Sequence, residues 1–184
     1  IKFGADRKIA ISAEPLFEIY AQIPAALSQL VNMQNQILPI LQDALGLKSS
    51  VPKSLNAAIR NGINSYRLPN DIGDLILNYW LNGGKYLRDV RDINEHFIAL
   101  VDYTFFKYEK EPGEILVLIP DNPEIKSAKD FKYDSEIDAY KVLEKGINEL
   151  NDLVETIFTR VGKEPKIFDH SISMKHMGTL EIEQ

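Results

Sequence analysis

Apolar residues recur at helical spacing along the first quarter of the chain. Between Glu14 and Gly46 they fall three or four residues apart, which places them on one side of an α-helix. The spacing predicts one long helix or two shorter ones, with Gly46 as the terminator. Pro24 and Pro39 lie inside the pattern and are expected to kink or split it. The polar stretch 32–36 is a candidate loop or exposed turn.

The same spacing predicts further helices downstream. One opens near Pro52, and another follows the capping sequence at 68–71. Asn82-Gly83-Gly84 is expected to break that helix from the next, which runs over about 85–100. A last helix is expected over about 135–161, where a glycine ends it.

Aromatic and β-branched residues replace the helical pattern over about 101–119. The order Pro112-Gly113 in this segment is typical of a type II turn, so the segment predicts a β-hairpin. Both hairpin faces are apolar, so we expect helices to cover one, and a third strand, the C-terminal tail or a second subunit to cover the other. The sequence thus predicts a mainly α fold, a helical bundle of four to six helices with an inserted β-hairpin. It forms a single helical domain over 1–162, followed by an irregular tail over 163–184.

Composition narrows the classes of function. The chain has no cysteine, which removes disulfides, thiolate nucleophiles and cysteine zinc sites and favours a cytoplasmic protein. Its apolar runs are shorter than the roughly 20 residues that span a bilayer, so no membrane partner is expected. A net charge of −6 opposes indiscriminate binding to nucleic acid, and an RNA partner would need a local basic patch. The sequence has no phosphate-binding loop, dinucleotide fingerprint or nucleophile elbow, so no cofactor is expected.

One short cluster carries residues suited to chemistry, Arg91-Asp92-Ile93-Asn94-Glu95-His96, on the helix predicted over 85–100. An imidazole with a pKa near neutrality can transfer a proton. A guanidinium can hold a phosphate with paired donors. An arginine and a histidine are therefore a minimal set for cleaving RNA through its own 2′-hydroxyl, without a metal.

The cluster resembles the HEPN superfamily, which consists of all-helical dimeric proteins marked by Arg, four to six residues and then His, often with a polar residue just after the Arg. The resemblance implies a metal-independent endoribonuclease or RNA-binding protein of a toxin or defence system, with two motifs facing each other across a homodimer. It would make Arg91 the phosphate clamp, His96 the proton-transfer group and Asp92 the orienting residue. Arg88 and Glu95 would flank them as substrate-binding residues.

The same residues also have a purely structural interpretation. Arg88 and Asp92, Arg91 and Glu95, and Asp92 and His96 are each four residues apart, which is typical of a salt-bridged helix face. At about 100° per residue, Arg91 and His96 lie roughly 140° apart on a regular helix, unless the glycine break distorts its start. The alternative function is a non-catalytic helical interaction or assembly domain with an unknown protein partner.

A metal site is the weakest interpretation. Asp92, Glu95 and His96 could join His170 and His176 around an ion, because a carboxylate and an imidazole one helical turn apart can share a metal. The two later histidines lack fixed ligand spacing. The sequence therefore predicts no metal site.

Overall fold

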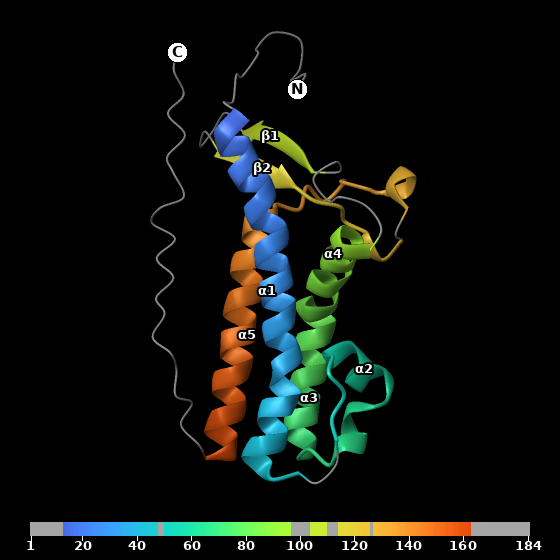
Figure 1. The fold of residues 1–184 in the computed structure, drawn as a ribbon, viewed down its shortest axis with the longest axis vertical. Helices are drawn as coiled ribbons and strands as arrows, with labels where there is room; N and C mark the ends of the chain where they lie inside the picture. The colour runs from blue at the N-terminus through green and yellow to red at the C-terminus, as the bar shows by residue number, and fades with distance from the viewer. Residues whose placement is uncertain (1–12, 48–49, 97–103, 110–113, 126, 163–184) are drawn as a thin grey trace.

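The computed structural model describes residues 13–47, 50–96, 104–109, 114–125 and 127–162. Three long helical segments run side by side along its long axis (Figure 1). The first is α1 (Ala13–Leu45) and the last is α5 (Ala139–Val161). The second in chain order consists of α3 (Asn70–Tyr79), the π-helical turn η2 (Trp80–Gly84) and α4 (Lys85–His96), and it runs in the opposite direction to the other two. In Figure 1, α1 lies between α5 and this second segment. A mainly α fold is thus confirmed.

Smaller elements close the two ends of the bundle (Figure 1). At one end lie α2 (Leu55–Arg60) and the 3-10 turn η1 (Ile63–Tyr66), which contact α1 and α3. At the other end lies the hairpin of β1 (Phe105–Glu109) and β2 (Glu114–Leu118). Two further 3-10 turns, η4 (Pro123–Ile125) and η5 (Ala128–Asp130), connect the hairpin to α5.

The first helix is continuous, so the first of the two expected arrangements, one long helix, is confirmed, and the split and the loop at 32–36 are wrong. Both Pro24 and Pro39 lie inside α1. Its buried stripe continues past them, and this packing outweighs the hydrogen bonds that each proline removes. The polar stretch 32–36 belongs to the helix, and two of its side chains have inward partners. Gln34 is buried, and the Asn35 side chain accepts a 2.9 Å hydrogen bond from the Leu55 backbone N–H at the start of α2.

The helix break expected at Asn82-Gly83-Gly84 is a π-helical turn in the structure. The chain continues from α3 into α4 through the π turn, in which one extra residue is accommodated without ending the helix. The Lys85 backbone N–H donates to the Trp80 carbonyl across this wide turn. Gly84 is needed here, because a Cβ at this position would lie 2.7 Å from the Tyr79 ring.

The hairpin is antiparallel, as predicted, with Phe105 opposite Leu118 and Glu109 opposite Glu114. Its expected Pro-Gly turn and residues 101–103 lie outside the described residues. Leu116 and Leu118 on one face of β2 and Val117 on the other are all buried. Both faces of β2 are therefore covered within one chain.

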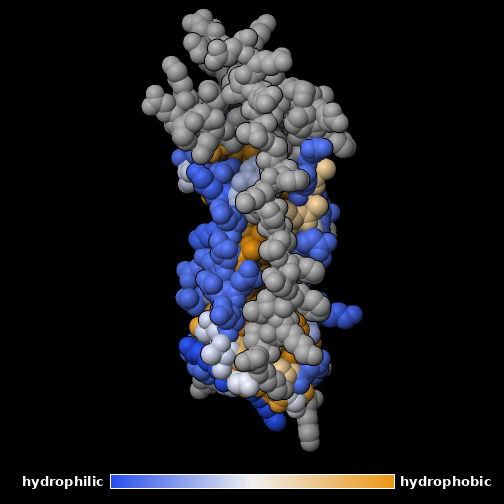
Figure 2. Space-filling model, turned by 90° about the vertical axis from the view of Figure 1, so that its left-hand side faces the viewer, coloured by the Kyte–Doolittle hydropathy of each residue, from blue (hydrophilic) through white to orange (hydrophobic). Residues whose placement is uncertain are grey.

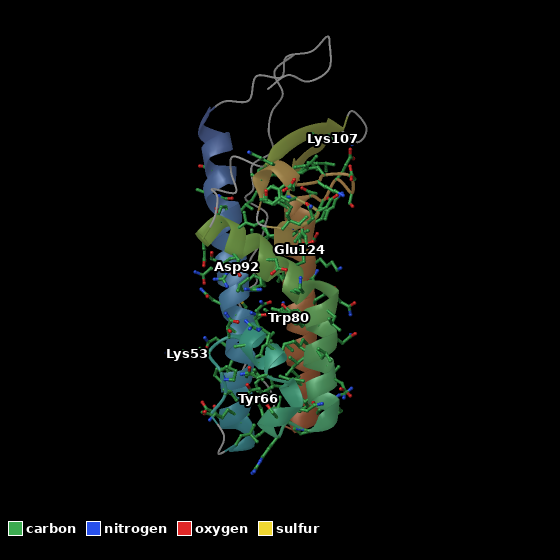
Figure 3. The ribbon with its side chains drawn as sticks, turned by 90° about the vertical axis from the view of Figure 1, so that its right-hand side faces the viewer. Lys53, Tyr66, Trp80, Asp92, Lys107 and Glu124 are labelled. Atoms are coloured by element: carbon green, nitrogen blue, oxygen red, sulfur yellow. The ribbon has the colours of Figure 1, made fainter. Side chains whose placement is uncertain are left out.

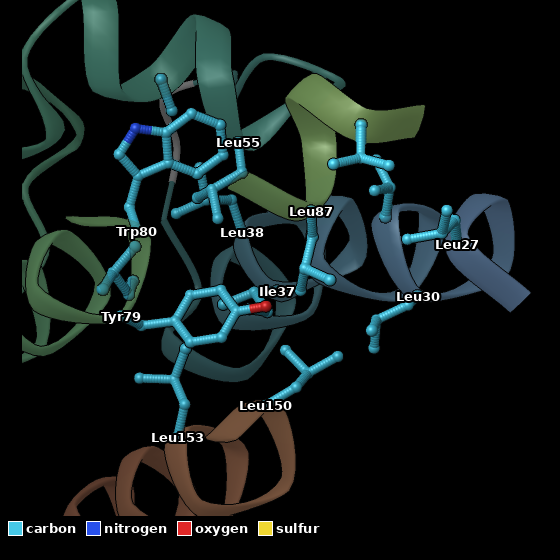
Figure 4. Close-up of a cluster of buried hydrophobic side chains, with 14 of the residues drawn as sticks. Leu27, Leu30, Ile37, Leu38, Leu55, Tyr79, Trp80, Leu87, Leu150 and Leu153 are labelled. Atoms are coloured by element: carbon cyan, nitrogen blue, oxygen red, sulfur yellow. The ribbon is translucent and has the colours of Figure 1, made fainter. Parts of the chain in front are cut away.

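The core lies between the three long segments (Figure 4). The Tyr79 ring sits among Ile37 of α1 and Leu150 and Leu153 of α5, and its hydroxyl donates a 3.0 Å hydrogen bond to Gln34 Oε1. α5 starts at Ala139, four residues later than expected, because Ile137 first pairs with the strand extension at Ile119. It ends as predicted at Gly162, whose φ is 69°. The tail predicted over 163–184 lies outside the described residues.

Candidate functional site

Six charged side chains form one continuous ion-paired row along α4, which we call the charge ladder. Its members are Lys85, Arg88, Asp89, Arg91, Asp92 and Glu95. Their spacing of three and four residues places them on one side of the helix. Three are cationic and three are anionic, so the ladder has no net charge. Figure 3 shows Asp92 on α4, near the middle of the molecule's long axis.

The first half of the ladder is centred on Asp89. Lys85 Nζ lies 2.7 Å from Asp89 Oδ2, and Arg88 Nη1 lies 3.1 Å from Asp89 Oδ1. The Asp89 side chain is only 6% exposed. A buried carboxylate is costly unless it is paired, and here two cations compensate it.

The second half is centred on Asp92, whose side chain is 8% exposed. Arg88 Nη2 lies 2.6 Å from Asp92 Oδ2, while Arg91 Nε lies 3.3 Å from Asp92 Oδ1. Arg91 Nη1 in turn donates to Glu95 Oε2 at 2.6 Å. Each arginine therefore bridges two carboxylates.

The ladder is also attached to α1. Ser28 Oγ donates a 3.0 Å hydrogen bond to Glu95 Oε1. This contact joins the end of the ladder to the neighbouring helix and fixes the carboxylate that Arg91 binds. The ladder is thus part of the packing between α1 and α4.

The structure brings together four of the five predicted site residues. Arg88, Arg91, Asp92 and Glu95 are in mutual contact through the ion pairs above. His96 is the last residue of α4, and its side chain lies outside the described residues. The π turn ends before Lys85, so it does not bend the part of the helix between Arg91 and His96.

The chemistry open to the ladder follows from these pairs. A phosphate would have to displace a carboxylate from a guanidinium that is already bound at both sides. It would also meet three carboxylates for three cations, whereas polyanion binding depends on surplus positive charge. The geometry therefore favours the salt-bridged interpretation of the cluster.

Neither a metal site nor a membrane span is evident in the part of the chain that the structure describes. Among the residues that the structure describes, no three metal-binding side chains come together. The proposed ligands His170 and His176 lie outside them. None of the described helices has the length and apolar character needed to cross a bilayer.

A small cavity of about 210 Å³ lies beside the π turn, between α4 and α5. Gly83, Tyr86 and Glu149 line it, and Glu149 Oε2 is buried without a hydrogen-bond partner. Burial, followed by the nearby charges of Asp121 and Glu124, raises the pKa of Tyr86 well above its usual value. Its hydroxyl stays protonated and donates to the Pro120 carbonyl at 2.8 Å. The cavity is smaller than typical ligand pockets of roughly 300–1,000 Å³.

An uncharged surface on α1 was not predicted from the sequence. The outward side of α1 from residue 21 to residue 40 carries no charged side chain. We call it the α1 outer face; its exposed residues are Ala21, Gln22, Ala25, Gln29, Asn32, Met33, Gln36 and Ile40. Met33 is 55% exposed and Ile40 is 46% exposed.

The lack of charge on this face is specific to α1. The exposed side of α5 carries both signs, for example at Lys141, Glu144 and Asp152, and hydrophilic side chains form a continuous column on the molecular face that includes α5 (Figure 2). By contrast, the sequence has no charged residue or histidine from Ile19 to Gln42, although 26% of the whole chain is charged. That uncharged run is the signal that sequence reasoning could have used.

Comparisons with known protein families, with curated proteins and with solved structures find no match to this chain.

Proposed function

We propose that this chain is a non-catalytic helical interaction domain whose contact surface is the α1 outer face. The observation that carries the proposal is the absence of charge along this exposed face. Charged residues are depleted at the centres of protein interfaces, since each would have to be desolvated when the partner binds. Charged side chains on an exposed helix keep it in water, and α5 has them.

The charge ladder has a supporting role in this proposal. It connects α4 to α1 through Ser28 and Glu95, on the inner side of the helix that carries the contact surface. The ion pairs of the two buried aspartates lie within α4 and order its charged side chains, including Arg91, which binds the carboxylate that Ser28 contacts. The ladder thereby stiffens the support of the α1 outer face.

Site-specific photo-crosslinking tests the proposal. A photoreactive residue at Gln29 on α1 is expected to give a discrete adduct in extract of the native host. The adduct should disappear on addition of excess unlabelled protein and should persist on addition of excess Gln36→Glu protein. The matched control places the same residue at Asn148, an exposed position on α5. Equal adducts from both positions, or none from Gln29, would overturn the proposal.

A second candidate function is the HEPN-like endoribonuclease. The observation that favours it is the grouping of Arg91, Asp92 and Glu95 within the last two turns before His96. In this case a substrate phosphate would replace Glu95 on Arg91, whose side chain is 18% exposed. Asp92 would keep the guanidinium oriented.

Cleavage of a mixed RNA pool in the presence of a chelator separates the two functions. If the interaction domain is correct, wild type, Arg91→Ala and His96→Ala all leave the RNA intact. Products with 2′,3′-cyclic phosphate ends, made by wild type and lost in both variants, would instead establish the ribonuclease. Circular dichroism of each variant shows whether a loss reflects unfolding.

A further inference from the structure

We propose that the partner of the α1 outer face is a second copy of this chain, bound antiparallel about a two-fold axis near Gln29 and Asn32. This inference rests on the proposed function and names its partner. It follows from three properties of the exposed positions, namely their symmetry, their sizes and their charge.

Six of the eight exposed positions of the α1 outer face exchange in pairs when the helix is reversed end to end. Reversing the helix about the midpoint between Gln29 and Asn32 places Ala21 at the position of Ile40 and Ala25 at that of Gln36. A two-fold interface requires this property, because the same patch must be complementary to itself. An antiparallel pair of α1 helices therefore places exposed positions against exposed positions at these three pairs, while Gln22 and Met33 face the half-buried positions 39 and 28.

The side-chain sizes also fit the antiparallel arrangement. Ala21 faces the partner's Ile40, and Ala25 faces the partner's Gln36, so a small residue opposes a large one in each pair. At the centre Gln29 faces the partner's Asn32, and each amide can both donate and accept a hydrogen bond. A parallel pair would place two alanines together at one end, which leaves a cavity. At the other end it would place two isoleucines together, which keeps the helices apart.

Charge restricts where two copies can meet. Each chain carries a net charge of −6, so two copies repel each other in most orientations. The α1 outer face has no charged side chain between Glu18 and Asp43. In the antiparallel register these two carboxylates face each other at both ends of the interface, where both are exposed and salt screens their repulsion. This face is thus suited to self-association.

The area of the α1 outer face determines how strongly two copies are expected to bind each other. Its 20 residues rise about 30 Å along the helix, and a helix is about 10 Å wide, which gives roughly 300 Å² of footprint on each copy. Stable interfaces bury about 800 Å² per partner. We therefore expect a reversible dimer that depends on protein concentration.

Disulfide trapping tests the dimer, because the natural chain has no cysteine to interfere. An equimolar mixture of Ala21→Cys and Ile40→Cys proteins is expected to form mixed disulfide dimers on mild oxidation, as is a mixture of Ala25→Cys and Gln36→Cys. Each variant alone should remain unlinked, since its two copies of the cysteine lie at opposite ends of the interface. Asn148→Cys on α5, mixed with Ala21→Cys, is the control and should remain unlinked.

Other linkage patterns would contradict the antiparallel dimer, the α1 outer face as contact surface, or both. Linkage of Ala21→Cys to itself would show a parallel pair and overturn the inference. Absence of linkage in all mixtures, together with monomers in sedimentation at high concentration, would also overturn it. If the Gln29 photo-crosslink still forms in extract with a different protein, the proposed function stands and only the second-copy partner is wrong. If that adduct is absent too, both fail.

A charge substitution gives an independent readout. In sedimentation, Ala25→Glu is expected to shift the protein from dimer to monomer, because the two-fold axis places the new carboxylates in the uncharged interface. Asn148→Glu adds the same charge on α5 and should leave the dimer unchanged. Helical circular dichroism should match wild type for both variants, since both positions are exposed. A dimer that survives Ala25→Glu would contradict the proposed face.

Discussion

Replacement of Asp92 by Ala is expected to lower the free energy of unfolding by about 2 kcal/mol. The substitution removes a nearly buried carboxylate, so Arg88 and Arg91, 26% and 18% exposed, each keep one carboxylate partner instead of two. Urea denaturation of wild type and variant measures the change, because the transition midpoint shifts in proportion to the lost stability.

Asp71 provides the matched control for this experiment. It also pairs with an arginine, Arg160 at 2.9 Å, but the two side chains are 55% and 43% exposed. Asp71→Ala should therefore cost no more than about 1 kcal/mol, even though Asp71 lies in the first turn of α3. If Asp92→Ala costs as little as Asp71→Ala, the charge ladder does not contribute to the packing of α4.

The second large effect is expected in the π turn, where Gly84→Ala should lower stability by about 2 kcal/mol. The new Cβ would meet three carbons of the Tyr79 ring at 2.7 to 3.3 Å. This ring cannot move freely, because it is buried and its hydroxyl is bound to Gln34. Thermal unfolding should show a decrease of roughly 4–8 °C for a chain of this size.

The neighbouring glycine is the control. A Cβ at Gly83 would meet Glu149 Oε2 at 2.6 Å, but this atom is the end of a flexible side chain that is 30% exposed. The carboxylate can rotate away, so Gly83→Ala should cost less than about 1 kcal/mol. Equal losses at the two positions would mean that the backbone of the π turn, and not the Tyr79 contact, requires glycine.

Much of the fold could be predicted from the sequence, because the buried stripes of the helices have the 3.6-residue period that packing requires. The end of α5 at Gly162 and the pairing of β1 with β2 follow from local signals. The continuity of α1 through Pro24 and Pro39 does not, since it depends on contacts with α4 and α5. Local proline rules describe an isolated helix, and tertiary packing overrides them here.

The candidate site, like the fold, could be predicted only in part from the sequence. The four-residue spacing of Arg88 with Asp92 and of Arg91 with Glu95 predicted their ion pairs, which are present. The burial of Asp89 and Asp92 could not be predicted, because neither aspartate is apolar and burial on α4 depends on elements distant in sequence, such as α1 and η4. The part played by Ser28 comes from a residue 67 positions away in the sequence.

The π turn determines where one residue could be deleted from the continuous helical segment of α3, η2 and α4. A π turn holds one residue more than the α-helical path that it replaces, so α3 and α4 keep the same rotational phase on either side of it. Loss of one residue within Trp80–Gly84 would convert the turn into regular α-helix and leave that phase intact. Loss of one residue anywhere else in α4 would rotate the rest of the helix by about 100° and turn the aspartates of the charge ladder away from their present surroundings. We therefore expect this segment to tolerate a single deletion best within the π turn, where the Gly84 carbonyl lies 3.5 Å from the buried Gln34 amide.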